Sequence, residues 1–214
     1  MSLAQKATTE PDLMLDGTAK ALIDPYLTRI GNRLALLGIT ADAITWAGFV
    51  IGALAALAIA WQYYMTGLAL LFISRLADGL DGAVARATKK TDLGGYLDIV
   101  LDFAFYGLIP LGFVFADPEA NAVAGAVLLL SFYVNGSSFL AYAVMAEKRG
   151  LDISQRGAKS LYFTTGLAEA TETLAVFAAF CLFPGQFAVI AWVFAVVCLY
   201  TAASRIVLAI KMFS

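Results

Sequence analysis

Long runs of apolar residues, separated by short polar stretches, account for most of this chain. Residues 43–61 and 120–146 contain no charged side chain at all. A helix of about 20 apolar residues is long enough to cross the hydrocarbon core of a bilayer. The pattern predicts an all-α, polytopic membrane protein with six transmembrane helices, placed at residues 43–61, from 67 into an acidic segment, and at 94–116, 120–146, 160–183 and 186–210.

Apolar and charged residues interleave at helical spacing before the first predicted span, between residues 17 and 37. Such a pattern predicts an N-terminal juxtamembrane amphipathic helix that lies in the membrane interface. Pro25 is expected to break or kink this helix. We therefore divide the chain into residues 1–42, the N-terminal tail with the interfacial helix, and residues 43–214, the six-helix transmembrane catalytic domain.

The overall composition agrees with a membrane domain. Hydrophobic residues make up 61% of the chain and charged residues 14%, and the mean hydropathy is +0.82. The net charge of −2 identifies no partner, and nothing in the sequence suggests a patch for nucleic acid. Cys181 and Cys198 both lie in apolar runs, where we expect small core residues rather than a disulfide or a metal site.

Lysine and arginine are distributed asymmetrically over the predicted topology. The turns near residues 62, 117 and 186 contain neither residue type, whereas both termini and the remaining loops are basic. The basic residues on that side are Lys6, Lys20, Arg29, Arg33, Arg86, Lys89, Lys90, Lys148, Arg149, Arg156, Lys159 and Lys211. By the positive-inside rule this side is cytoplasmic. We expect a protein of the bacterial inner membrane with both termini in the cytoplasm.

One segment interrupts the apolar pattern with acidic residues at helical spacing. Asp78 and Asp81 are three positions apart, and Asp98 and Asp102 are four positions apart, so each pair lies on one face of a helix. A short turn between the two helices would make them antiparallel. The four carboxylates would then point into one pocket, which opens on the predicted cytoplasmic side.

A cluster of four carboxylates requires positive charge nearby or the uptake of protons. Oxygen-only sites suit hard cations such as Mg²⁺ or Mn²⁺, and the chain contains no histidine to favour a softer metal. Two such cations can bind a diphosphate and orient an attacking oxygen. The alternative is a structural network of ion pairs with Arg75, Arg86 and Lys89, which would leave the small residues Gly82 and Ala85 unexplained.

The acidic segment resembles the signature of the CDP-alcohol phosphotransferase (CDP-alcohol phosphatidyltransferase) family, integral membrane enzymes that build phospholipids. The matching pattern is Asp78-x2-Asp81-Gly82-x2-Ala85-Arg86-x7-Gly94-x3-Asp98-x3-Asp102. It fixes eight residue identities over 25 positions, which argues against a chance match. Outside residues 77–102 the resemblance rests on the number and length of the helices.

The resemblance implies a role for each aspartate. Asp78, Asp81, Asp98 and Asp102 would hold a two-metal site of Mg²⁺ or Mn²⁺. Asp102 would also act as the catalytic base that takes the proton from the acceptor hydroxyl. The resemblance implies, in addition, that the protein is a homodimer.

The same signature implies a binding site for the CDP moiety of a substrate, formed by Gly82, Ala85 and Arg86. Gly82 and Ala85 lack bulk where a ligand would approach the helix, and Arg86 is placed to meet phosphate. For Arg86 alone, the alternative is a cytoplasmic anchor.

Thr45 is a further candidate for contact with the CDP moiety. It lies in a segment that resembles the family's entry to the first span, although Ala41 and Asp42 replace the usual proline and asparagine. We weigh this contact equally against simple capping of the helix by Thr40 or Asp42.

Glu169 and Glu172 form a second acidic pair within a predicted span, where unpaired charge is costly. They would either contact the acceptor alcohol or form a structural ion pair with Arg156, Lys159 or Arg205. Arg156 and Lys159 could also hold an acceptor phosphate, and anionic lipid headgroups are the alternative partners.

The resemblance implies transfer of a substituted phosphate from a CDP-linked lipid donor to a small alcohol, with release of CMP. CDP-diacylglycerol is the expected donor. The reaction would take place at the cytoplasmic surface of the membrane, in contact with membrane lipids. Basic loops favour a phosphorylated polyol such as glycerol 3-phosphate or inositol phosphate as acceptor. A divalent-cation transporter that uses the aspartates as its ion site is the alternative function, and it predicts acids near the middle of the membrane. A prenyl transferase would need a second aspartate-rich motif, which the sequence lacks.

Overall fold

The computed structural model describes residues 15–150 and 170–214 of the chain. Every regular element within these residues is helical, as the sequence predicts, and no strand occurs among them. In chain order the elements are α1 (Leu15–Leu36), α2 (Ala41–Ala60), α3 (Tyr64–Ala87), α4 (Asp92–Ala116), α5 (Pro118–Lys148), α7 (Ala170–Leu182), the 3₁₀ turn η2 (Pro184–Gln186) and α8 (Phe187–Phe213).

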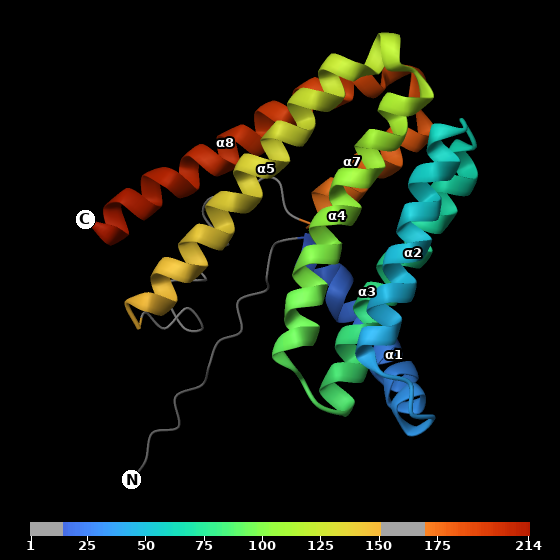
Figure 1. Cartoon of the computed structure of the whole chain (residues 1–214), viewed down its shortest axis with the longest axis vertical. Helices are drawn as coiled ribbons and strands as arrows, with labels where there is room; N and C mark the ends of the chain where they lie inside the picture. Colours follow the sequence, from blue (N-terminus) through green and yellow to red (C-terminus); the bar gives the residue numbers. More distant parts are fainter. Residues whose placement is uncertain (1–14, 151–169) are drawn as a thin grey trace.

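The helices form two groups (Figure 1). In the first, α2, α3 and α4 pack against one another, and α1 lies against α3. In the second, α5 and α8 run side by side and lean away from the first group. Contacts of α5 with α4, and of α7 with both α3 and α8, connect the two groups.

Four helical segments are long and apolar enough to cross a membrane: α2, α4, α5 and Pro184–Phe213, which contains α8. The charged residues of α3 keep it from this set, and the described part of α7 has only 13 residues. The six predicted spans and the interfacial placement of α1 therefore stay predictions. Large apolar side chains such as Trp46 and Val50 are about half exposed on α2, as expected of a surface that faces lipid.

α1 is one continuous helix on the surface of α3. It runs through Pro25, so of the two outcomes expected at this proline, a break or a kink, the break is wrong. A proline within a helix removes one hydrogen bond and crowds the preceding turn. We attribute the persistence of α1 to its contacts with α3, which are so close that a Cβ on Gly31 would lie 2.8 Å from the Cβ of Ala83.

An aromatic core joins α4, α7 and α8. Phe113 stacks on Phe187 with ring centroids 5.0 Å apart, and Phe180 contacts both rings. Phe105 packs against Phe177 one layer away. All five rings are buried, and both cysteines of the chain are free and buried, as expected. This core fixes α4, which carries two of the predicted site residues.

α2 and α4 approach each other closely at Gly112. A Cβ at this position would lie 2.6 Å from the backbone oxygen of Ala56, which cannot move aside as a flexible side chain could. We therefore expect Gly112→Val to lower the free energy of unfolding by about 1 to 3 kcal/mol. Thermal unfolding in detergent measures the change. Gly185→Val is the control, because a Cβ there meets nothing within 4 Å, and equal stability of the two variants would contradict the prediction.

Candidate active site

Three of the predicted aspartates meet where α3 and α4 face each other. One carboxylate oxygen from each of Asp78, Asp81 and Asp98 lies within 4.8 Å of the other two. The helices are joined by the short loop 88–91 into a hairpin (Figure 1). α4 begins after Thr91, whose hydroxyl accepts a hydrogen bond from the backbone N–H of Gly94 at 3.0 Å. The turn therefore brings the two acidic faces together, as their spacing predicts.

Asp102, the fourth predicted ligand, is not part of this group of three and is held by an arginine. Nη1 of Arg75 donates to Oδ1 of Asp102 and lies 3.6 Å from Oδ1 of Asp78. The guanidinium also lies over the ring of Phe105, with Cζ 3.7 Å from the centroid. The structure thus brings three carboxylates together and pairs the fourth with Arg75. The sequence suggested Arg75 only as a member of a structural network of ion pairs.

Thr45 supports the cluster from α2. Its hydroxyl donates to Oδ2 of Asp81 at 2.6 Å, and Asp81 is only 6% exposed. The helix is capped by Thr40, whose hydroxyl accepts a hydrogen bond from the backbone N–H of Ala43 at 3.3 Å. Thr40 therefore caps α2, while Thr45 fixes the orientation of the most buried carboxylate.

A groove of about 290 Å³ opens beside the aspartates. The four residues predicted to contact the CDP moiety, Thr45, Gly82, Ala85 and Arg86, all line it. The other lining residues are Ala41, Asp42, Asp81, Lys89, Lys90, Thr91, Gly94, Gly95 and Asp98. The lining therefore includes both acidic and basic groups, which suits a ligand that carries both a diphosphate and a cation.

Arg86 links this groove to α1. Its Nη2 lies 3.0 Å from Oδ1 of Asp24, and both side chains are about half exposed. The partner of Arg86 is thus an aspartate outside the signature. No sequence pattern predicted this contact, because the two residues are 62 positions apart.

The donor set of the cluster fits a hard divalent cation. Three carboxylates offer only oxygen ligands, the chemistry that Mg²⁺ and Mn²⁺ prefer. Asp81 is buried, Asp78 is partly buried and Asp98 is exposed, so the cluster is closed on one side and open on the other. An open side leaves coordination positions for a ligand or water.

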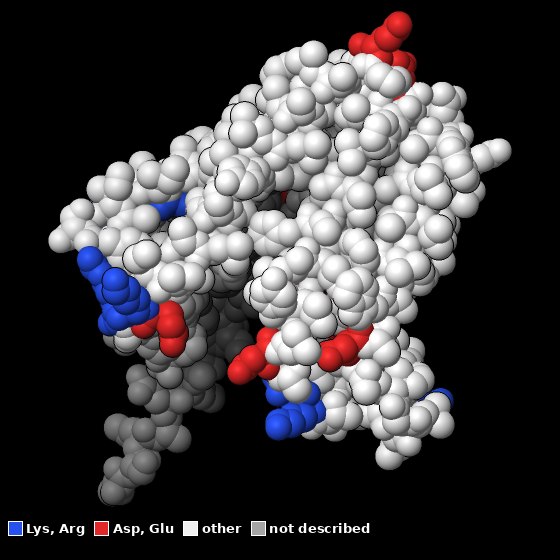
Figure 2. Space-filling model, in the orientation of Figure 1, with Lys and Arg blue, Asp and Glu red and all other residues white. Residues whose placement is uncertain are grey.

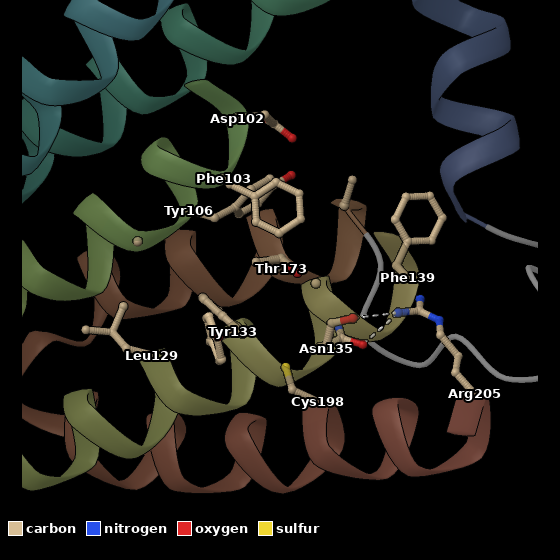
Figure 3. Close-up of a pocket in the computed structure, with 14 residues that line it drawn as sticks. Asp102, Phe103, Tyr106, Leu129, Tyr133, Asn135, Phe139, Thr173, Cys198 and Arg205 are labelled. Carbon is tan, nitrogen blue, oxygen red and sulfur yellow. Dashed lines mark hydrogen bonds between the residues drawn. The ribbon is translucent and has the colours of Figure 1, made fainter. Parts of the chain in front are cut away.

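A second cavity, of about 410 Å³, adjoins Asp102 between the two helix groups (Figure 3). Five of its fourteen lining residues are aromatic, and the walls come from α4, α5, α7 and α8. The lining residues are Asp102, Phe103, Tyr106, Gly107, Leu129, Phe132, Tyr133, Asn135, Gly136, Phe139, Ala170, Thr173, Cys198 and Arg205. Arg205 donates through Nη1 to Oδ1 of Asn135 at 2.7 Å, which holds a cation in this otherwise apolar wall.

The residues predicted to contact the acceptor are placed only in part. Arg156, Lys159 and Glu169 lie outside the described residues. Glu172 lies near the start of the described part of α7, and its Oε2 is buried with no hydrogen-bond partner among the described residues. Glu172 is also absent from the described residues that line the second cavity.

The sequence did not identify the Asn135–Arg205 pair as a site feature. Asn135 belongs to a short patch of polar and small residues on α5, residues 135–138. Its neighbour Gly136 packs closely against the ring of Phe103. The bond itself joins α5 to α8 across 70 positions, so only the fold could reveal it.

Charged side chains gather toward the ends of the molecule, and the face between them carries mainly uncharged atoms (Figure 2). Acidic and basic atoms lie together at the end that holds the α3–α4 loop. The groove beside the aspartates therefore opens at a polar end next to an apolar belt. A protein that works at a membrane surface requires this arrangement.

These features agree with the comparison to known sequences. The sequence model of the CDP-alcohol phosphatidyltransferase family matches residues 38–203. The protein therefore belongs to the CDP-alcohol phosphatidyltransferase family and is a phosphatidyltransferase enzyme of phospholipid synthesis. The family predicted from the acidic signature is confirmed, and the transporter alternative is not favoured.

Two relatives illustrate the range of the family. The Inner membrane protein YnjF of Escherichia coli (strain K12) is 46% identical over 193 residues, which cover 90% of this chain and 94% of that protein. An archaetidylinositol phosphate synthase of Pyrococcus horikoshii is 33% identical over 132 residues, which cover 61% of this chain and 70% of that enzyme. The first relative and the apolar helices both support a membrane protein.

Solved structures share the fold. The phosphatidylinositol phosphate synthase PgsA1 of Mycobacterium tuberculosis, with CDP-DAG bound, superposes with a TM-score of 0.67. The match covers 84% of this chain and 91% of that one, at 23% sequence identity. The same enzyme in complex with manganese and citrate gives a TM-score of 0.67 as well. At this identity the likeness establishes the fold alone.

Proposed function

We propose that the protein transfers a substituted phosphate from a CDP-linked lipid, CDP-diacylglycerol, to the hydroxyl group of a small alcohol and releases CMP in a divalent-cation-dependent reaction. The observation that carries the proposal is the position of three carboxylates, Asp78, Asp81 and Asp98, beside the groove lined by the CDP-signature residues. The CDP-DAG bound in PgsA1, which has the same fold, supports this donor.

The donor would bind with its nucleotide in the 290 Å³ groove and its lipid tails in the bilayer. Gly82 and Ala85 leave room for the nucleotide against α3, and Arg86 would exchange Asp24 for a phosphate. Asp78, Asp81 and Asp98 would hold Mg²⁺ or Mn²⁺, and the bound cation would neutralise the charge of the diphosphate. The manganese complex of PgsA1 supports a divalent cation, and the choice between the two metals stays open to experiment.

The acceptor would bind in the 410 Å³ cavity. Asp102 lines this cavity. It also lines a narrow gap beside the cluster, together with Asp78 and Asp98. Asp102 would accept the hydroxyl proton as the acceptor oxygen forms its bond to the lipid-linked phosphorus. The bond from this phosphorus to CMP breaks, and CMP leaves with the electron pair. Asp102 then returns its proton to solvent.

A phosphorylated polyol is the acceptor class that we propose. Arg205 presents the charge that would hold its phosphate in the cavity. The archaetidylinositol phosphate synthase and the phosphatidylinositol phosphate synthase among the similar proteins support inositol phosphate as a first choice, with glycerol 3-phosphate as a second.

The membrane topology, the oligomeric state, the domain boundary and the border of the acceptor site are also proposals. The distribution of basic residues supports a topology with the termini and the aspartates on the cytoplasmic side of a bacterial inner membrane. We propose a homodimer from the family resemblance, and a domain boundary between residues 42 and 43 from the pattern of apolar residues. Glu169, Glu172, Arg156 and Lys159 are proposed to border the acceptor site.

The decisive test is a panel of acceptors. Purified full-length protein is supplied with Mg²⁺ or Mn²⁺, CDP-diacylglycerol and one alcohol at a time, and CMP release is measured. We expect release with a phosphorylated polyol and none after chelation of the cation. No CMP with any acceptor, together with cation uptake into liposomes, would overturn the proposal.

Arg205→Gln tests the acceptor site separately. The variant keeps a hydrogen-bond donor for Asn135 but loses the charge, so we expect KM for the phosphorylated acceptor to rise about 10-fold or more. KM for CDP-diacylglycerol should stay within about twofold of its original value. Lys211→Gln on the same helix is the control, and an unchanged acceptor KM in Arg205→Gln would remove Arg205 from the site.

A further inference from the structure

Asn135 is a neutral polar residue in the middle of α5, one of the helices long and apolar enough to cross a membrane. A polar side chain at such a depth is costly unless it has a partner. Asn135 lines the 410 Å³ cavity and bonds to Arg205 of α8 (Figure 3). The proposed reaction uses Arg205 to hold the acceptor but assigns no role to Asn135.

Two oxygens of Asn135 accept hydrogen bonds from the same nitrogen of Arg205. Nη1 of the arginine donates to the side-chain Oδ1 at 2.7 Å and to the backbone oxygen at 3.3 Å. The backbone oxygen also accepts from Oγ of Ser138 at 2.7 Å. Cζ of Arg205 lies 5.7 Å from the ring centroid of Phe139, one turn further along α5. One turn of α5 therefore holds the guanidinium at a defined place on the cavity wall.

The chemical type of residue 135 decides how much charge Arg205 presents. An aspartate of the same shape would hold the arginine at least as firmly, because charged hydrogen bonds are stronger than neutral ones. It would also cancel the positive charge, an effect that is large away from water. An amide oxygen orients the guanidinium and leaves its charge intact.

That charge has few competitors in the cavity. Arg205 is the one cationic residue among the fourteen described residues that line it, and Asp102 is the one acidic residue among them. Attraction of an anionic group into the described part of the cavity therefore depends on the charge that Arg205 keeps.

We propose that Asn135 is a positioning residue that determines the specificity of the acceptor cavity. It holds Arg205 at the cavity wall without neutralising it, so that the cavity selects an alcohol that carries a phosphate over the same alcohol without one. This inference rests on the proposed function and adds the residue that acts through Arg205.

Asn135→Asp tests the inference with almost no change of shape. Purified full-length protein is supplied with Mg²⁺, CDP-diacylglycerol and increasing inositol phosphate, then glycerol 3-phosphate, and CMP release is measured. We expect KM for the phosphorylated acceptor to rise about 10-fold or more, and kcat and KM for CDP-diacylglycerol to stay within about twofold. The temperature of thermal unfolding should not fall, because the bond to Arg205 persists. A residue that only ties α5 to α8 would tolerate this change, so an unchanged acceptor KM would overturn the inference.

A double-variant cycle tests whether Asn135 acts through Arg205. Effects of residues that act through one another do not add. We expect Asn135→Ala to raise KM for the phosphorylated acceptor by about 3- to 10-fold in the original protein, and by less than about twofold in the Arg205→Gln background. Equal changes in the two backgrounds would overturn the inference. Asn135→Asp keeps the inference testable where Asn135→Ala fails to fold.

Ser137→Ala is the matched control in the same polar patch of α5. Oγ of Ser137 donates to the backbone oxygen of Val134 at 3.1 Å, and Ser137 is absent from the described residues that line the cavity. Its acceptor KM should equal that of the original protein, and a rise as large as that in Asn135→Asp would overturn the inference.

The same assays separate this inference from the proposed function. CMP release with an unphosphorylated alcohol as readily as with its phosphate would overturn the role of Asn135 and leave the phosphatidyl transfer intact. Absence of CMP with every acceptor would reject the proposed function itself.

Discussion

Asp102→Asn is expected to lower kcat for CMP release by a factor of about 10² to 10⁴, the usual contribution of a positioned general base. Asparagine has nearly the same shape and its side-chain oxygen can still accept the hydrogen bond from Arg75, but it cannot take up the acceptor proton. KM for CDP-diacylglycerol should change little, because Asp102 lines the acceptor cavity rather than the CDP groove. Steady-state CMP release over a range of donor concentrations measures both constants.

Asp92→Asn is the matched control for this variant. It makes the same chemical change on the same helix, but Asp92 is exposed in the first turn of α4 and lines neither cavity among the described residues. Its kcat should equal that of the original protein. Retention of most of the activity in Asp102→Asn would assign the base to another group.

Asp81→Asn is expected to weaken Mn²⁺ binding by roughly 100-fold or more and to abolish CMP release at ordinary cation concentrations. Asp81 is the most buried of the three clustered carboxylates, and its loss leaves only Asp78 and Asp98 to hold the cation. Replacing a buried carboxylate with a neutral amide removes a desolvated charge, so the variant should still fold. Equilibrium titration with Mn²⁺ measures the affinity directly.

Thr45→Val extends the same test to the residue that orients Asp81. The variant removes the 2.6 Å hydrogen bond and leaves every carboxylate in place. We expect a loss of about 10- to 100-fold in Mn²⁺ affinity, the usual effect of removing a group that orients a metal ligand. An Asp81→Asn variant with unchanged affinity would show that the cation binds elsewhere.

The sequence predicts three of the four members of the acidic cluster because the relevant spacing is local. Residues that are three or four positions apart lie on one face of a helix. The four-residue loop between α3 and α4 makes these two helices face each other. The residues that line the groove could be predicted for the same reason. Gly82, Ala85 and Arg86 lie on the helical turns next to Asp81, so their positions depend on local spacing. Helix positions also followed from the apolar runs.

Partners across the bundle could not be predicted. The contact of Arg75 with Asp102 depends on the position of the guanidinium over the ring of Phe105. The Asn135–Arg205 bond depends on how α5 and α8 align. The persistence of α1 through Pro25 depends on its packing against α3, which no local rule contains.

The contact between Arg86 and Asp24 connects α1 to the groove proposed for the nucleotide. Both side chains are about half exposed, so water screens the pair, and breaking it costs only about 0.2 to 1 kcal/mol. A diphosphate carries more charge than one carboxylate and would displace Asp24 readily. In the proposed reaction, the N-terminal helix would therefore hold Arg86 through Asp24 only until the diphosphate of the lipid donor replaces that aspartate.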